Sequence, residues 1–185
     1  MKMKWDTDRI VAVCAMLVGI GSLFIVLYQT SLMREQAKAS VLPYLLIAFN
    51  TNREGSYIAL RNAGLGPALV DQIRVILQGK TFEGDPYAYY RSLEQDKAQS
   101  AYRDRVPPGM LISPGQTLNM LGSTDPDVMR DALLRTFSFV AVGDEAAAAD
   151  RGAPQQEKAV LEIVYSSVYG ERWHVRSDRV VPEPL

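Results

Sequence analysis

Hydrophobic positions are concentrated in one unbroken run near the start of the chain. Residues Ile10 to Tyr28 are nineteen consecutive positions without a charged side chain. At about 1.5 Å per residue, a helix of this length just crosses a hydrocarbon core of roughly 30 Å. A cleaved signal peptide has a shorter apolar core with a small-residue cleavage site directly after it, whereas Arg34 and Glu35 follow here. We therefore expect residues 1–9 to be an N-terminal flank and residues 10–28 to be an uncleaved transmembrane anchor in the lipid bilayer.

The helical pattern continues beyond the apolar run. Residues 29–42 contain no Gly or Pro and are rich in Gln, Met, Lys and Ala, which are good helix formers. Pro43 disfavours a helical conformation at the residue before it. The pattern predicts that residues 29–42 form a juxtamembrane helix, continuous with the anchor to about Val41.

Four small side chains fall on one face of the predicted spanning helix. They are spaced three, four and three residues apart: Ala12, Ala15, Gly19 and Ser22. Because apolar side chains gain nothing by leaving lipid, helices in a membrane associate where small residues let their backbones approach. The pattern predicts a helix-packing seam for a homodimer or for another membrane protein. Small residues are also common in spanning helices without a partner, and that interpretation stays open.

From residue 43 to residue 185 the hydrophobic pattern has the period of strands rather than helices. Short alternating segments are separated by turns that contain Gly, Pro or Asn. Strands are expected at 44–49, 56–62, 70–78, 110–112, 117–121, 159–167 and 172–177. Many short strands without a regular strand–helix rhythm favour a mainly β domain, a two-sheet β-sandwich over residues 43–185.

Two helical insertions interrupt the strands. Asp85-Pro86 is typical of a helix start, with an N-cap acid followed by proline, and predicts a helix over residues 87–100. A second start at Ser123 to Pro126 predicts a helix to about Arg135. Residues 144–156 are expected to form a loop.

The turn motifs of the domain suggest a resemblance. The segment Leu60-Arg61-Asn62-Ala63-Gly64-Leu65-Gly66-Pro67-Ala68 and the later Ile112-Ser113-Pro114-Gly115-Gln116-Thr117 resemble the turns of bacterial immunoglobulin-like β-sandwich modules. The whole layout is similar to uncharacterised bacterial single-pass membrane proteins with such a domain. The resemblance implies an immunoglobulin-like fold and carries no catalytic residue. The two insertions depart from a plain sandwich.

Charge and cysteine content narrow the classes of partner. Residues 42–185 carry 15 Lys and Arg against 18 Asp and Glu, which argues against a nucleic-acid partner because such a partner requires a basic face. The single cysteine, Cys14, lies in the apolar run, so a disulfide framework is excluded. Three basic residues precede the span and two, Arg34 and Lys38, follow it closely, which favours a C-terminal domain outside the cytoplasm by one charge.

No catalytic, metal or cofactor motif emerges from the sequence. His174 is the one histidine, and without cysteines in the domain it does not make a zinc motif. We expect it to be a surface residue on the solvent face of its strand, opposite Trp173. We therefore predict no catalytic residue, no metal ligand and no cofactor, and the sequence does not indicate whether a small molecule binds.

Aromatic residues provide a candidate binding surface. Tyr and Trp are enriched at protein interfaces, and in a sandwich they also fill the core. The candidates for a partner surface are Tyr87, Tyr89, Tyr90, Tyr169 and Trp173.

The sequence thus predicts a membrane-anchored, non-enzymatic interaction or assembly module, placed in the inner membrane with its domain in the periplasm. Two alternatives stay open. One is a cell-envelope enzyme that acts on glycan or peptide through a carboxylate pair such as Glu162 and Glu171. The other is a regulatory subunit of another membrane protein.

Overall fold

The chain consists of one long helix and one β-rich domain. The computed structural model describes residues 7–52, 55–93, 104–123, 126–140 and 158–185. Contacts divide the chain into two units, residues 1–40 and 41–185. Each unit is described by itself.

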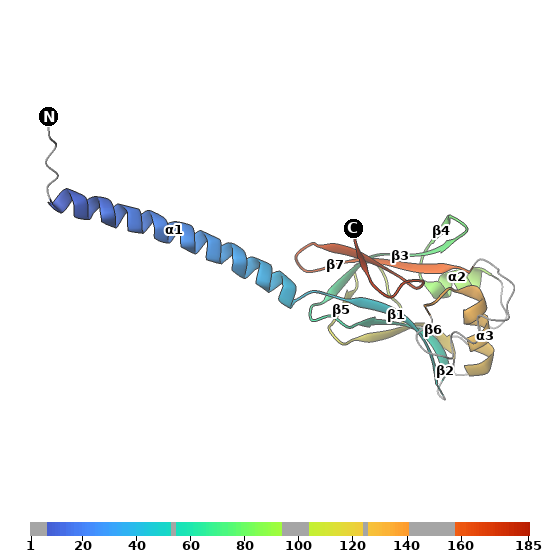
Figure 1. Cartoon of the computed structure of the whole chain (residues 1–185). Coiled ribbons are helices and arrows are strands. Elements are labelled where there is room, and N and C mark those ends of the chain that lie inside the picture. The colour runs from blue at the N-terminus through green and yellow to red at the C-terminus, as the bar shows by residue number, and fades with distance from the viewer. Residues whose placement is uncertain (1–6, 53–54, 94–103, 124–125, 141–157) are drawn as a thin grey trace. The chain divides into compact units, whose positions relative to one another are not determined.

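Helix α1 runs without a break from Thr7 to Ser40 (Figure 1). It is long and apolar enough to cross a membrane, with the candidate span at Ile10–Lys38 and every described side chain of that span exposed. The predicted continuation of the apolar helix beyond Tyr28 is confirmed, with an end one residue before the expected Val41. Pro43 explains the end, because it restricts Leu42 to extended conformations.

The first sheet of the domain has three antiparallel strands in the order β1-β2-β6. Strands β1 (Leu45–Asn52) and β2 (Gly55–Asn62) form the predicted hairpin, and β6 (Thr117–Ser123) lies on the other side of β2. A bulge between Ile58 and Ala59 shifts the β2–β6 register.

The second sheet has the order β4-β3-β7-β8-β9 and is also antiparallel. Its strands are β3 (Ala68–Leu77), β4 (Lys80–Glu83), β7 (Val160–Ser166), β8 (Arg172–Arg176) and β9 (Glu183–Pro184). The short strand β5 (Leu111–Ile112) pairs with the start of β3. A bulge at Asp71 separates the start of β3 from its longer pairing with β7.

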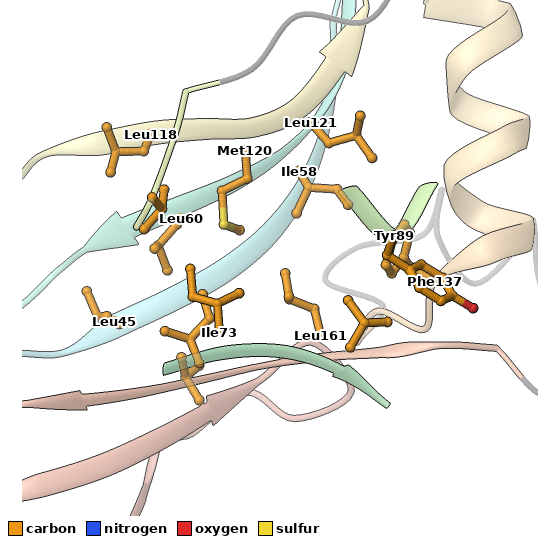
Figure 2. Packing of buried hydrophobic residues seen from close by; sticks show 14 of the residues in the cluster. Leu45, Ile58, Leu60, Ile73, Tyr89, Leu118, Met120, Leu121, Phe137 and Leu161 are labelled. Atoms are coloured by element: carbon orange, nitrogen blue, oxygen red, sulfur yellow. The ribbon is translucent and has the colours of Figure 1, made fainter. Parts of the chain in front are cut away.

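The two sheets share one hydrophobic core. Figure 2 shows Ile58, Leu60 and Met120 of the first sheet pointing toward Ile73 and Leu161 of the second. All five side chains are nearly or fully buried, as the alternation of the strands predicts.

Two short helices close one end of this core. In Figure 1, α2 (Pro86–Ser92) and α3 (Pro126–Thr136) lie at the end of the domain opposite β5. The predicted cap of α2 is present, since Asp85 Oδ1 accepts a hydrogen bond from the Ala88 amide at 2.8 Å. The ring of Tyr89 packs edge-on against Phe82 and Phe137, with centroids 5.5 and 5.8 Å apart, which joins α2 to β4 and to the end of α3.

The structure combines helices with two open antiparallel sheets, and it contains the expected N-terminal apolar helix and two helical insertions. Strands β4 and β9 were not predicted, because Lys80–Glu83 and Glu183–Pro184 are too short to show alternation. Helix α2 is shorter than the helix expected over residues 87–100, since it ends at Ser92 with Leu93 as its C-cap. The flank up to residue 6, residues 94–100 and the loop expected at 144–156 lie outside the described residues.

Candidate functional site

The small residues of the predicted seam all lie on α1 and are exposed: Ala12, Ala15, Gly19 and Ser22. The Ser22 hydroxyl donates to the Val18 carbonyl at 2.8 Å, so this polar group is satisfied within the helix. A Cβ added at Gly19 would meet no atom within 4 Å. Partner contact at this face stays a prediction.

The predicted aromatic surface is largely wrong. Tyr89 and Tyr90 are buried in the core, because the edge-on ring contacts of Tyr89 and the packing of α2 turn this side of the helix inward. Tyr87 is half-buried against the same core. Trp173 is half-buried and stacks on Tyr165 at a centroid distance of 5.8 Å. Of the five, only Tyr169 in the β7–β8 turn is exposed.

A network of hydrogen bonds ties together the end of the domain at which the chain enters it, called here the entry end. Asn62, the last residue of β2, is fully buried there. Its Oδ1 accepts from the amides of Tyr44 and Gly64, at 3.3 and 3.0 Å. Its Nδ2 donates to the carbonyls of Gly66 and Ile112, at 2.8 and 3.0 Å. One side chain therefore holds together the entering chain, the 63–67 loop and β5.

Backbone contacts complete this junction. The amides of Leu65 and Gly66 both donate to the Leu42 carbonyl, at 3.1 and 3.3 Å. The Gly115 amide donates to the Asn62 carbonyl at 2.8 Å, which adds the 113–116 turn. The position of residues 41–44 on the domain is thus fixed by hydrogen bonds within the domain itself.

Exposed apolar side chains gather at the entry end. Ten large apolar side chains are exposed among the described residues of the domain, and only Leu93, Val180 and Val181 lie elsewhere. The pairings of the second sheet place Leu69 directly opposite Leu111 on the same outer face. The seven residues of this apolar group are Leu42, Leu65, Leu69, Leu111, Val168, Tyr169 and Leu185.

The same end is poor in charge. Apart from Leu185, its residues belong to uncharged runs of the sequence at 39–52, 62–70, 106–124 and 163–170. Residues 42–185 carry 33 charged side chains, about one in four, so runs of 14, 9, 19 and 8 residues are not the average of this domain. Charged side chains border these runs: Arg61 at the end of β2, Glu171 in the β7–β8 turn, and Arg172 at the start of β8, whose Nε donates to Asp71 Oδ2 at 3.1 Å. Arg172 and Asp71 lie beside a shallow depression between β3 and the β7–β8 turn.

A second cluster of functional groups lies on the outer face of the second sheet. Glu162 on β7 is almost fully buried, and its carboxylate bonds to Arg74 of β3 and to His174 of β8, the latter at 2.9 Å. His174 also faces Glu183 of β9 at 3.2 Å, and Glu183 pairs with Arg179. His174 does lie on the face opposite Trp173, as expected, but it is mostly buried among these partners.

This charged network stabilises the ionised form of the Glu162 carboxyl. Burial by itself would raise the pKa of the Glu162 carboxyl, but hydrogen bonds from His174 and Arg74, with the charges of both, outweigh it and hold the pKa below its ordinary value. The carboxyl therefore stays charged and paired at neutral pH.

The network predicts an acid-sensitive contribution to stability. Because the folded-state pKa of Glu162 is lowered, its contribution is complete above the unfolded-state pKa and is lost as the pH falls through the folded value. The free energy of unfolding should thus decrease from about pH 5 to about pH 3. In Glu162→Gln it should be about 2 kcal/mol lower at pH 7 and depend less on pH, since Arg74 and His174 lose an ionic partner. Urea titrations at several pH values measure this, with the exposed Glu83→Gln as control. An unchanged pH profile in Glu162→Gln would contradict the assignment.

The carboxylate pair of the enzyme alternative does not form. Glu162 lies opposite Arg176, whereas Glu171 is in the turn beyond the Ser166–Arg172 pair. They are therefore at least about 13 Å apart along the strand, beyond the roughly 5–9.5 Å that separates the carboxyls of glycosidases. Glu162 is also neutralised by its partners, and Glu171 accepts from the Ser167 hydroxyl at 3.4 Å.

Metal ligands were not predicted, and among the described ranges no group of three or more His, Cys, Asp or Glu side chains is placed to hold a metal ion.

Sequence reasoning missed both the Asn62 junction and the apolar group. The uncharged runs were a usable signal for the apolar group, because about one residue in four of this domain is charged. Comparison with family models, curated proteins and solved structures finds no match to this chain.

Proposed function

We propose that this chain is a membrane-anchored, non-enzymatic interaction module that binds through the entry end of its domain. Helix α1 is the anchor in this proposal, and the apolar group at the entry end is the binding surface. The proposal differs from the sequence-based one in the surface used, because the tyrosines of α2 are buried.

One observation carries the proposal: seven of the ten exposed large apolar side chains of the described domain lie at a single end, six of them in uncharged segments. Exposed apolar side chains scattered singly are normal, whereas their concentration in one patch marks an interaction site. The junction built around Asn62 supports a rigid surface, because its side-chain and backbone bonds tie the entering chain, the 63–67 loop, β5 and the 113–116 turn together. Rigid surfaces lose less conformational entropy on binding.

We also infer that the domain is an immunoglobulin-like sandwich. Its pairing orders, β1-β2-β6 and β4-β3-β7-β8, correspond to strands A-B-E and C′-C-F-G of that fold. The insertion of α2, β5 and α3 and the added strand β9 are departures from the plain arrangement. In this fold the loops at the two ends of the sandwich commonly bind partners.

For location, we infer an inner-membrane protein with the domain on the periplasmic side. Three basic residues before the span against two after it support this orientation. An alkaline-phosphatase fusion after Leu185 that is inactive would overturn it.

The function proposal predicts that the entry end is covered in native membranes. In a Cys14→Ser background, Leu111→Cys is to be compared with the matched control Val180→Cys, because the two side chains are 52% and 53% exposed in the isolated chain. Exposure alone predicts equal rates of labelling by a water-soluble maleimide. If a partner covers the entry end, Leu111→Cys should react about tenfold more slowly. Equal rates in intact membranes would rule out the proposed binding surface.

A further inference from the structure

We propose that the apolar group at the entry end docks into the headgroup layer of the bilayer that α1 spans. This rests on the proposed function and names the partner: a lipid surface, rather than a protein, covers the end. Two observations support this proposal. One is the short distance along the chain between the apolar helix and the domain, and the other is the set of exposed apolar side chains at the entry end.

The chain between the apolar helix and the domain is short. Charged residues are absent from Ile10 through Met33, so the uncharged run extends to 24 residues, about 36 Å of helix. A hydrocarbon core of roughly 30 Å can therefore end as late as Met33. From there, Arg34 to Ser40 adds seven residues, about 10 Å, before the domain begins at Val41.

That distance exceeds the depth of the headgroup layer, roughly 5–7 Å on each side of the core, by only a few Å. Arg34 and Lys38 then fall at the depth of the lipid phosphates, where basic side chains are favourable. With the core ending at Met33, chain length alone therefore keeps Val41 near the outer edge of the headgroup layer.

The exposed side chains of the entry end are of the kinds that insert favourably into a headgroup layer. Leu65 and Val168 lie in short turns and are strongly exposed, so they protrude without any change in the fold. Tyr169 has an amphipathic ring, which favours the boundary between lipid and water. The uncharged runs that carry these residues avoid the cost of moving charged groups out of water.

Because the docking side chains are uncharged, the proposed docking can be distinguished by experiment from electrostatic binding to lipid. Binding driven by basic patches requires anionic lipid and weakens with salt. Docking through Leu65, Leu111 and Val168 should occur on neutral phosphatidylcholine and should be insensitive to salt. A surface built for a charged protein partner would not behave in this way.

The test uses the purified full chain, with Cys14→Ser and one new cysteine, in phosphatidylcholine vesicles. A fluorophore at Leu65→Cys or Leu111→Cys should be quenched by headgroup nitroxide lipids at least about threefold more than one at Val180→Cys. With the probe at Val168→Cys, the pair Leu65→Asp and Leu111→Asp should abolish the quenching, while Leu93→Asp with Val181→Asp should not. Fluorescence of Trp173 in a Trp5→Phe background verifies that each variant is folded.

The outcomes separate this inference from the function on which it rests. Quenching at the entry end that persists at high salt supports lipid docking. Absence of quenching overturns the lipid inference. If Leu111→Cys is nevertheless protected from maleimide in native membranes, a protein covers the end and the proposed function stands. If neither effect is seen, both proposals fail.

Discussion

Replacing Asn62 with alanine is expected to lower the free energy of unfolding of the domain by about 3 kcal/mol or more. The side chain is fully buried and makes four hydrogen bonds to backbone groups. Its loss leaves two amides, of Tyr44 and Gly64, and two carbonyls, of Gly66 and Ile112, without this partner. A buried polar group left unpaired costs about 1–3 kcal/mol, and water entering at the surface recovers part of the total.

The measurement is urea unfolding of the full chain in detergent, followed by Trp173 fluorescence in the Trp5→Phe background. Asn50→Ala on the exposed side of β1 is the matched control and should change stability by less than about 0.5 kcal/mol. Asn62→Asp keeps the acceptor but places a carboxylate oxygen against two carbonyls, so it should be no better than alanine. A loss below about 1 kcal/mol in Asn62→Ala would mean that Asn62 does not organise the entry end.

The sequence predicted the parts of this protein that local patterns determine. The anchor and its continuation to Ser40 follow from apolar length and from Pro43. The long strands follow from alternation, and the start of α2 from Asp85-Pro86. In these elements the local preference and the tertiary packing agree.

The features that sequence reasoning missed depend on contacts between distant residues. Asn62 was taken only as part of a turn, since its bond to Ile112, fifty residues away, exists only once β5 pairs with β3. Glu162 alternates as an outward residue of β7, yet it is buried because Arg74 and His174 from the two neighbouring strands cover it. Alternation predicts which face a side chain takes, but it does not predict how far neighbouring side chains cover that face.

The tyrosines of α2 also show that the local sequence does not predict burial. Tyr89 and Tyr90 were candidates for a partner surface because tyrosine is enriched at protein interfaces. A seven-residue helix is too short for a hydrophobic period to show which side is buried. Conversely, Leu65 lies in a turn and Leu111 in the two-residue strand β5, where no period can be recognised, so their exposure depended on the fold. The candidate surface therefore loses the tyrosines of α2 and keeps Tyr169 at the entry end.

Gly66→Ala is expected to destabilise the domain by about 3 kcal/mol or more, well beyond the usual cost of altering a turn glycine. A Cβ at this position would lie 1.7 Å from the carbonyl oxygen of Val41 and 2.4 Å from its carbonyl carbon. Both atoms are backbone, so no side chain can move to relieve the overlap. Either residues 41–42 or the 63–67 loop must shift, and the bonds from Leu65 and Gly66 to the Leu42 carbonyl break.

Gly115→Ala is the informative comparison, because the sequence alone treats both glycines as turn residues. Gly115 has φ +76° and no neighbour within 4 Å of an added Cβ, so its cost is conformational only, about 1 kcal/mol. The same urea titration should rank Gly66→Ala well above Gly115→Ala in lost stability. Equal losses would mean that the approach of Val41 to Gly66 is not fixed in the folded protein. The chain length from Met33 to the domain would then no longer hold the apolar group at the membrane surface, so this ranking also tests a premise of lipid docking.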